Sequence, residues 1–325
     1  MVFSNILNSI RGALPIFPHA LLGYGGKIVK DGVALVQGSS STSSSSSASK
    51  EASQQERTAL ALKNAPTKEA YIQILAQTAS YCNFPKKHAL ERSEHFACPA
   101  YQIKKTISYP SGIKAIVVIS DDVSEPPIIA FRGTDTSNAS NVIDDLNVNI
   151  GEINCKEYAK ELREEIERLH KKYGRIHLTG HSYGGTIALR LAAEYPALIL
   201  RCTTHNSPGP GKRVVKKFTK NVAKLPRHLS EPEIVRYRHA KDLPSLLGGK
   251  HLPTPLGKSY TMGSVADKIS YIESHSLNGL STGAKVAIDA PAEKSLKKMA
   301  KKIEKLRKGA SILVPLFQLI KKVQK

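Results

Sequence analysis

The residues best suited to chemistry are a serine between glycines, in the segment GHSYGG at residues 180–185. A serine hydroxyl is a weak nucleophile until a base removes its proton, and that base is commonly a histidine oriented by a carboxylate. The spacing Gly-X-Ser-X-Gly is typical of a tight turn that exposes the hydroxyl. The pattern therefore predicts nucleophilic catalysis by Ser182. The turn residues around it are Gly180, His181, Tyr183, Gly184 and Gly185.

The sequence on either side of this turn indicates a strand followed by a helix. Residues 176–179 (IHLT) form a short β-branched run, and residues 186–195 combine helix-forming composition with apolar positions before Pro196. Such a strand, turn and helix would place the serine at the carboxyl edge of a sheet. Gly180 and Gly184 are expected where a side chain would collide with the neighbouring elements. His181 is expected to pack or hydrogen-bond within the turn rather than to act as the base.

The acid and the base should follow the serine, because hydrolases with this turn carry their residues in the order serine, acid, histidine. Asp242 follows the run at 234–238, where a strand would bring it to the same edge. Beyond it, His275 is favoured as the base because it lies late in the domain on an irregular segment, and His251 is the alternative. The competing acids are Asp267, Glu231 and Glu233.

Acyl transfer also requires hydrogen-bond donors for the negative oxygen of the tetrahedral intermediate. One donor is expected to be the backbone N–H of Tyr183, the residue after the nucleophile. The second is expected in the turn FRGT at residues 131–134, which follows an apolar run and ends in the hydroxyl of Thr134.

Short β-branched runs alternate with helical segments between residues 54 and 290, which favours a single α/β domain. The expected architecture is a mostly parallel central sheet with helices on both faces. A hydrophobic content of 41% fits a chain with one large core. The clearest predicted strands are Ile116–Ile119, Ile128–Phe131, Ile176–Thr179 and Ile234–Tyr237.

Several blocks, in the same order along residues 65–285, resemble the class 3 lipases, the fungal-type branch of the α/β-hydrolase superfamily. The long helix predicted at 156–173 leads into GHSYGG, as it does in that family. The other blocks that carry the likeness are residues 71–82 (YIQILAQTASYC), 129–134 (IAFRGT) with 141–146 (NVIDDL), 204–211 (THNSPGPG), 242–244 (DLP) and 275–277 (HSL).

The resemblance implies an α/β-hydrolase fold with Ser182 as nucleophile, Asp242 as orienting acid and His275 as general base. It also implies that Thr134 and the amide of Tyr183 are the oxyanion donors, and that residues 135–148 form a lid that moves at a lipid interface. The sequence departs from the family because it has no tryptophan and because this lid is polar. Strong interfacial activation is therefore not expected.

Three flanking segments lie outside the resemblance. Residues 1–38 are expected to form a hydrophobic arm, either membrane-active or packed on the domain, and the serine-rich residues 39–53 predict a flexible linker. Residues 291–325 form a basic amphipathic tail, since residues 293–325 carry eleven Lys or Arg and two Glu, a net charge of +9. The tail is interpreted as a helix lying in a membrane interface, with a helix docked on the domain as the alternative.

The net charge of +21 indicates an anionic partner. An anionic membrane surface is expected to bind residues 293–325, with a lipid as substrate, whereas nucleic acid matches the charge but no base-reading motif supports it. The four cysteines lack CxxC spacing, which predicts free thiols and no metal site, and no cofactor is expected. Oligomeric state stays open.

No secretory signal and no apolar stretch of about 18–20 residues is recognised, so a peripheral membrane or cytoplasmic location is expected. A viral or host-membrane-directed setting is a hypothesis suggested by the unusual flanks. Together the features predict hydrolysis of a lipid acyl ester through an acyl-enzyme intermediate, by a lipase or phospholipase. The alternatives are a soluble esterase or thioesterase, and a membrane-binding or structural protein that keeps the fold without turnover.

Overall fold

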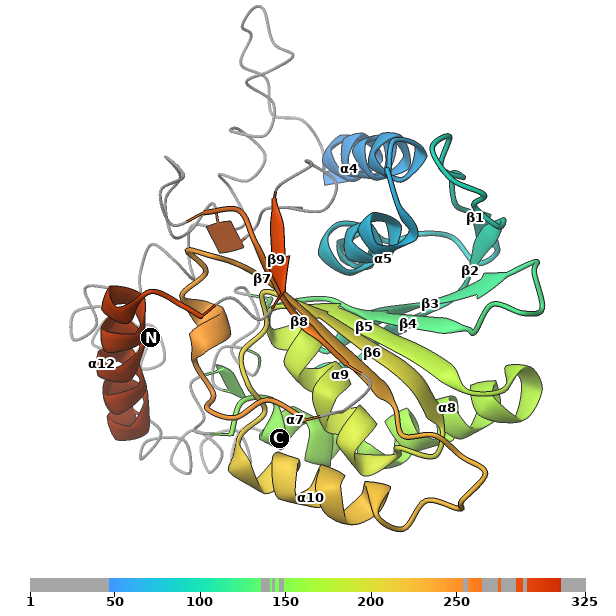
Figure 1. Cartoon of the computed structure of the whole chain (residues 1–325). Coiled ribbons are helices and arrows are strands. Elements are labelled where there is room, and N and C mark those ends of the chain that lie inside the picture. The colour runs from blue at the N-terminus through green and yellow to red at the C-terminus, as the bar shows by residue number, and fades with distance from the viewer. Residues whose placement is uncertain are drawn as a thin grey trace, which may run out of the picture.

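The computed structural model describes residues 47–135, 141, 144–145, 149–253, 257–264, 274–275, 285–288 and 291–310. Within these residues, nine strands form one sheet in the order of the sequence (Figure 1). The strands are β1 (His88–Ala89), β2 (Tyr101–Ser108), β3 (Lys114–Ser120), β4 (Ile128–Phe131), β5 (Ile176–His181), β6 (Ile199–His205), β7 (Glu233–His239), β8 (Ser259–Met262) and β9 (Val286–Ile288).

The central strands of this sheet are parallel. β4 to β8 run in one direction, whereas β1 to β4 pair antiparallel with one another and β9 pairs antiparallel with β8. Every residue of β4 and β5 is buried, as expected for parallel strands that are covered on both faces. The carboxyl ends of β4 to β7 consequently lie along the same edge, and the residues that follow them can converge there.

Helices cover both faces of the sheet, with α4 and α5 on one side and α7 to α10 on the other (Figure 1). Alternate residues of β4 divide between two hydrophobic cores: Ile129 and Phe131 face the α8–α9 side, and Ile128 and Ala130 face the α5 side. The helices are α4 (Ser47–Lys63), α5 (Lys68–Gln77), η1 (Ala79–Tyr81), α7 (Glu152–Glu157), α8 (Ala159–Tyr173), α9 (Tyr183–Glu194), α10 (Lys212–Val222), η2 (Pro244–Leu246) and α12 (Lys294–Ala310).

The predicted mostly parallel sheet with helices on both faces is confirmed, and the four predicted strands lie in β3, β4, β5 and β7. The single helix expected at 156–173 is instead two helices, α7 and α8, that meet at Tyr158. The ring of Tyr158 stacks on Tyr109 at a centroid distance of 4.4 Å, which anchors this junction to the end of β2. The four cysteines are free thiols, as predicted.

The start of α4 corrects one boundary. This helix begins at Ser47, so residues 47–53 are helical although the sequence predicts a flexible linker there. The side chains of Glu51 and Gln55 hydrogen-bond the backbone of Asn83, and these contacts tie the helix to the domain. The predicted N-terminal arm, the remainder of the linker and the apolar run at 312–320 lie outside the described residues. None of the described helices is both long and apolar enough to cross a membrane.

Helix α12 packs its apolar face on the domain. Leu296, Ala300 and Ile303 are buried, and the last two cluster with Leu247, which directly follows η2. The lysines of the helix are exposed. Residues 294–310 therefore have the docked arrangement that the sequence left as the alternative, and their lysines rather than their apolar side chains are available to a partner.

Candidate active site

Ser182 lies in a strained turn between β5 and α9. Its backbone has φ +52° and ψ −127°, a conformation that is costly for a residue with a side chain and that usually marks a functional site. The Ser182 N–H donates to the carbonyl of His205 at the end of β6, at 2.9 Å. The turn thus holds the serine at the carboxyl edge of the sheet, as the motif predicts.

The glycines of the segment allow the backbone to pass close to its neighbours. A Cβ atom on Gly180 would collide with the backbone of Gly184, and one on Gly184 would collide with the carbonyl oxygens of Phe131 and Arg132. A Cβ on Gly185 would collide with the Ser207 side chain. These contacts join the turn to the ends of β4 and β6, so each of the three positions excludes a side chain on steric grounds.

The structure brings Ser182, His275 and Asp242 into one hydrogen-bonded chain. His275 Nε2 lies 2.8 Å from Ser182 Oγ, and His275 Nδ1 lies 2.6 Å from Asp242 Oδ1. Asp242 is fully buried, and its second oxygen accepts the N–H of Ser245 at 2.8 Å. With Asp242 ionised, Nδ1 of the imidazole carries the proton and Nε2 is left to accept the serine proton. This arrangement can activate the Ser182 hydroxyl for attack on a carbonyl carbon.

The alternatives for the acid and the base lie elsewhere. His251 contacts the Ser245 carbonyl at 3.4 Å, and burial holds its pKa well below the usual range. Glu233, at the start of β7, forms an ion pair with Arg201, and Glu231 lines a cavity beside it at the opposite edge of the sheet. Asp267 lies outside the described residues. Among the described candidates, His275 is the imidazole that reaches Ser182, and Asp242 is the carboxylate that hydrogen-bonds it.

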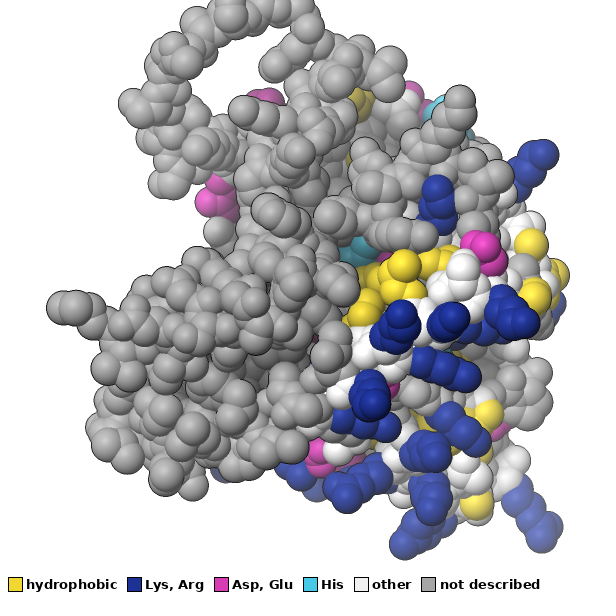
Figure 2. Space-filling model, turned by 90° about the vertical axis from the view of Figure 1, so that its left-hand side faces the viewer, with side chains coloured by type: hydrophobic (Ala, Val, Ile, Leu, Met, Phe, Trp, Pro, Cys, Tyr) yellow, Lys and Arg dark blue, Asp and Glu magenta, His cyan; other side chains and the backbone are white. Residues whose placement is uncertain are grey.

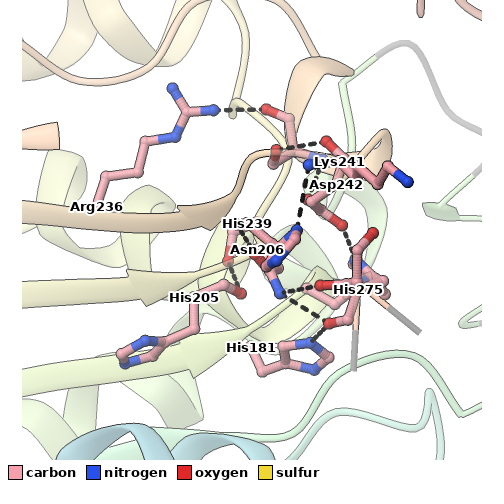
Figure 3. A network of polar contacts seen from close by, with 12 residues as sticks. His181, His205, Asn206, Arg236, His239, Lys241, Asp242 and His275 are labelled. Carbon is pink, nitrogen blue, oxygen red and sulfur yellow. Dashed lines mark hydrogen bonds and ion pairs between the residues drawn. The ribbon is translucent and has the colours of Figure 1, made fainter. Parts of the chain in front are cut away.

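Two side chains hold the backbone of His275 in place (Figure 3). His181 Nε2 donates to the His275 carbonyl at 2.8 Å, and Asn206 Nδ2 donates to the same oxygen at 2.9 Å and to the Ser274 carbonyl at 3.1 Å. Burial lowers the pKa of His181 to about 3, so its ring is neutral. The sequence predicts that His181 packs or hydrogen-bonds within the turn, whereas its ring reaches out of the turn, to the residue proposed as base and, at 3.4 Å, to the hydroxyl of Tyr81.

Asn206 is a site residue that sequence reasoning missed. It is fully buried directly after β6, has φ +50°, and accepts the His239 N–H at 2.7 Å. Asparagine tolerates this left-handed conformation better than most residues. An asparagine just beyond the strand next to the serine turn was the available signal, but its partners come from segments 33 and 69 residues away.

The predicted oxyanion donors lie on either side of the turn. Thr134 follows β4, the parallel neighbour of β5, and its hydroxyl is hydrogen-bonded to the Asp145 carboxylate. Tyr183 is the first residue of α9, so its N–H has no partner within the helix and remains available at the helix N-terminus. Beside Thr134, the Gly133 N–H donates to the hydroxyl of Tyr81 at 3.0 Å.

Two neighbouring carboxylates of the predicted lid contact this region. Asp144 is buried and accepts the N–H groups of Ile153 and Asn154 and the hydroxyl of Tyr183. Burial raises the pKa of Asp144 despite these three donors, and it raises the pKa of Asp145 to about 6. Besides these two carboxylates, Asp135 and Asn141 of the predicted lid are described, and the other lid residues lie outside the described residues.

Comparison with known proteins identifies the fold. The family model for the alpha/beta hydrolase fold matches residues 131–307, more than half of the chain. A crystal structure of a fungal lipase is 12% identical with a TM-score of 0.40, covering 75% of this chain and 88% of that chain. The triacylglycerol lipase of Penicillium expansum is 13% identical with a TM-score of 0.39, covering 65% and 80%.

The Lip2 lipase of Yarrowia lipolytica is 18% identical with a TM-score of 0.36, covering 68% of this chain and 83% of that chain. No curated protein sequence matches the chain. The similarity to these lipases is one of fold at low identity, and the family assignment rests on the model that spans the serine turn, Asp242 and His275. On that match, the chain belongs to the alpha/beta hydrolase fold family.

Proposed function

We propose that this protein is a serine hydrolase that cleaves acyl ester bonds of lipids, as a lipase or phospholipase. The observation that carries the proposal is the continuous hydrogen-bonded chain from Ser182 Oγ through His275 to Asp242. A buried carboxylate, an imidazole and a serine in a strained turn are the groups that acyl transfer by a covalent intermediate requires.

The proposed reaction begins when Ser182 Oγ attacks the ester carbonyl while its proton passes to His275 Nε2. Asp242 stabilises the imidazolium that forms, and the Tyr183 N–H and the Thr134 side chain are the proposed donors to the oxyanion. Collapse of the intermediate breaks the ester C–O bond, and His275 returns the proton to the departing alcohol. Water, deprotonated by the same imidazole, then hydrolyses the acyl-serine.

The charge distribution supports a lipid surface as the place of action. Figure 2 views the side of the molecule on which α12 lies and shows Lys and Arg side chains gathered there, beside hydrophobic ones. Helix α10 also presents a basic surface, because its apolar Val214 and Phe218 are buried while its Lys and Arg side chains are exposed. Each cation near an anionic leaflet contributes about 1 kcal/mol of binding. We therefore propose that the substrate is a lipid of an anionic membrane.

The decisive experiment is labelling of the full chain with a fluorophosphonate, which reacts with an activated serine. Wild type should be labelled and Ser182→Ala should not. In parallel, p-nitrophenyl esters of increasing acyl length and phospholipid vesicles would be offered as substrates. Ser182→Ala should lose on the order of 10⁴–10⁶-fold in turnover, and Asp242→Asn on the order of 10⁴-fold, because the imidazole then adopts the wrong tautomer.

The outcomes separate the competing functions. Labelling together with activity that falls as the acyl chain lengthens, and no cleavage in vesicles, would indicate a soluble esterase or thioesterase. Absence of labelling in folded wild-type protein would contradict hydrolase activity and favour a membrane-binding or structural protein. Activity on vesicles that depends on Ser182 is the result that the proposal requires.

A further inference from the structure

A second cavity lies on the α9 side of the sheet, away from the serine hydroxyl. It has a volume of about 200 Å³ and is bordered by Leu189 of α9, Thr204 of β6 and Arg236 of β7, with His251 and Lys258 from the segment that leads into β8. No catalytic role is assigned above to any of these side chains.

The lining of this cavity carries positive charge only. Arg236 and Lys258 are the cationic residues of the lining, and no carboxylate occurs among the described residues that line it. Burial, reinforced by Arg238 on the same strand, lowers the pKa of Arg236 to about 10, so this cation is poorly compensated. The carboxylate that acts on it, Asp242, is already bonded to His275 and Ser245.

Several polar atoms around the cavity lack a hydrogen-bond partner within the described part of the chain. They are Arg236 Nε, Thr204 Oγ1 and His251 Nδ1, all of them buried. Most buried polar groups in proteins are paired, because an unpaired one costs about 1–3 kcal/mol. Three such atoms on one small cavity suit a polar occupant, and the cationic residues of the lining favour an anion.

We propose that this cavity binds a small phosphate-bearing anion, held by the Arg236 guanidinium and the Lys258 ammonium with the Thr204 hydroxyl as a further donor. Guanidinium groups match phosphate oxygens in geometry, and about 200 Å³ accommodates a phosphate group but not a lipid body. The phosphate can be free in solution or belong to a headgroup presented by a membrane. The residues that line the cavity do not include Ser182, Asp242 or His275, so this proposal does not rest on the hydrolase activity.

The cavity is also connected to the proposed acid of the active site. Arg236 Nη2 donates to the Ser245 carbonyl at 2.7 Å, and Ser245 donates its N–H to the Asp242 carboxylate and its hydroxyl to the Asp242 carbonyl (Figure 3). An anion bound to the Arg236 guanidinium is therefore linked to Asp242 through a single residue, Ser245. We expect occupancy to alter turnover as well as stability.

The test measures thermal unfolding of the full chain in sodium phosphate and in sodium chloride at equal ionic strength, with calorimetric titration of inorganic phosphate. Wild type should show a saturable rise in Tm, because a ligand that binds only the folded state stabilises it. Lys258→Gln should bind phosphate at least tenfold more weakly. Lys258 is exposed, so this change leaves the core intact. The matched control is Lys224→Gln, another exposed lysine that does not line the cavity.

A second pair of variants and a second probe complete the test. Arg236→Gln and Thr204→Val should each weaken binding if they fold. Vesicles of phosphatidic acid in phosphatidylcholine distinguish a headgroup from a free anion: binding to vesicles alone that is lost in Lys258→Gln assigns the phosphate to a lipid. Failure of wild type to bind either probe, or equal binding by wild type and Lys258→Gln, would overturn the proposal. These outcomes do not depend on fluorophosphonate labelling, so the hydrolase proposal can fail separately.

Discussion

At the scale of single residues, the position of His275 depends on its backbone as much as on Asp242. The His275 carbonyl accepts hydrogen bonds from His181 and from Asn206, and Asn206 also reaches the backbone of His239. These contacts join the ends of β5, β6 and β7 to the segment that carries the proposed base. Asn206 is therefore a positioning residue, since it acts on Ser182 only through His275.

Replacing Asn206 with glycine tests this role, because glycine accepts the positive φ and removes only the amide. The His275 carbonyl would lose one of two donors, at a cost of about 1–2 kcal/mol. We expect kcat to fall about 10-fold and KM to stay within about twofold, as for an interaction that positions the base without contacting substrate. A rise in KM as large as the fall in kcat, or an unchanged kcat in folded protein, would contradict the assignment.

Asp145 gives a pH dependence whose sign follows from its raised pKa. The folded chain binds the Asp145 proton more tightly than the unfolded chain, where the pKa is 3.8, so this group favours folding below about pH 4. The contribution disappears as the pH rises through about 6. Asp145→Asn removes the partly buried charge and keeps an oxygen for the Thr134 hydroxyl.

This variant should raise the free energy of unfolding at pH 8 by about 1–2 kcal/mol and leave it unchanged at pH 4. Urea denaturation at the two pH values measures the difference. Asp122→Asn is the control of opposite sign, because hydrogen bonds from Ser124 lower the pKa of Asp122 and that change should reduce stability at pH 8. Equal effects of both changes at both pH values would count against this account.

At the scale of elements, Tyr183 links three segments that the sequence leaves unconnected. Its hydroxyl donates to Asp144 of the predicted lid at 2.8 Å and accepts the Asn154 amide of α7 at 2.7 Å. Tyr183 begins α9, so the helix behind the nucleophile, the base of the lid and α7 share one buried network. The same residue supplies the backbone N–H that is proposed for the oxyanion.

Tyr183→Phe should separate the structural role of this side chain from the proposed role of its backbone. The change removes the Tyr183 hydroxyl as an acceptor for the Asn154 amide and leaves Asp144 with two of its three donors, which should cost about 1–3 kcal/mol of stability. Because the N–H remains, kcat should change less than about threefold. Tyr158→Phe removes an exposed hydroxyl that donates to the adjacent Glu157, and it should be nearly neutral in urea denaturation.

The sequence was sufficient for elements whose patterns are local, and insufficient where distant segments meet. Buried β-branched runs predicted β3, β4, β5 and β7, and glycine spacing predicted the turn around Ser182. The sequence does not show the junction at Tyr158, because it depends on the ring of Tyr109, just after β2. It does not show the helical start at Ser47 either, because that helix is held by side-chain contacts from Glu51 onward. The sequence favours His275 over His251 as the base but cannot decide between them, because only the folded structure shows which imidazole reaches Ser182.

At the scale of the whole molecule, α12 joins the basic tail to the neighbourhood of the site. Its apolar face covers Leu247, and Arg307 donates to the Asp145 carbonyl at 3.2 Å. Charge pattern alone predicted the helix but could not decide what its apolar face covers, because a membrane and a protein surface bury such a face equally well. Because the apolar face of α12 packs on the domain, the exposed lysines are the side chains through which the helix can bind an anionic membrane.

Membrane binding through those lysines can be tested without disturbing the docked face. Lys298 and Lys302 are exposed and one helical turn apart on α12, so replacing both with glutamine removes two charges and leaves Leu296, Ala300 and Ile303 in place. At about 1 kcal/mol per cation near an anionic leaflet, binding to vesicles rich in anionic lipid should weaken roughly 30-fold, with less difference at high salt.

The matched control replaces Lys86 and Lys87, exposed residues next to β1 on the far side of the molecule from α12 in Figure 1, and should bind vesicles like wild type. Hydrolysis of a short soluble ester should be equal in all three proteins, because the Lys298 and Lys302 side chains do not contact the hydrogen-bonded chain from Ser182 to Asp242. If the two double variants lose vesicle binding equally, net charge alone attracts the protein and α12 has no particular part in it. A loss confined to the α12 variant, with soluble activity retained, would place α12 against the membrane with the site beside it.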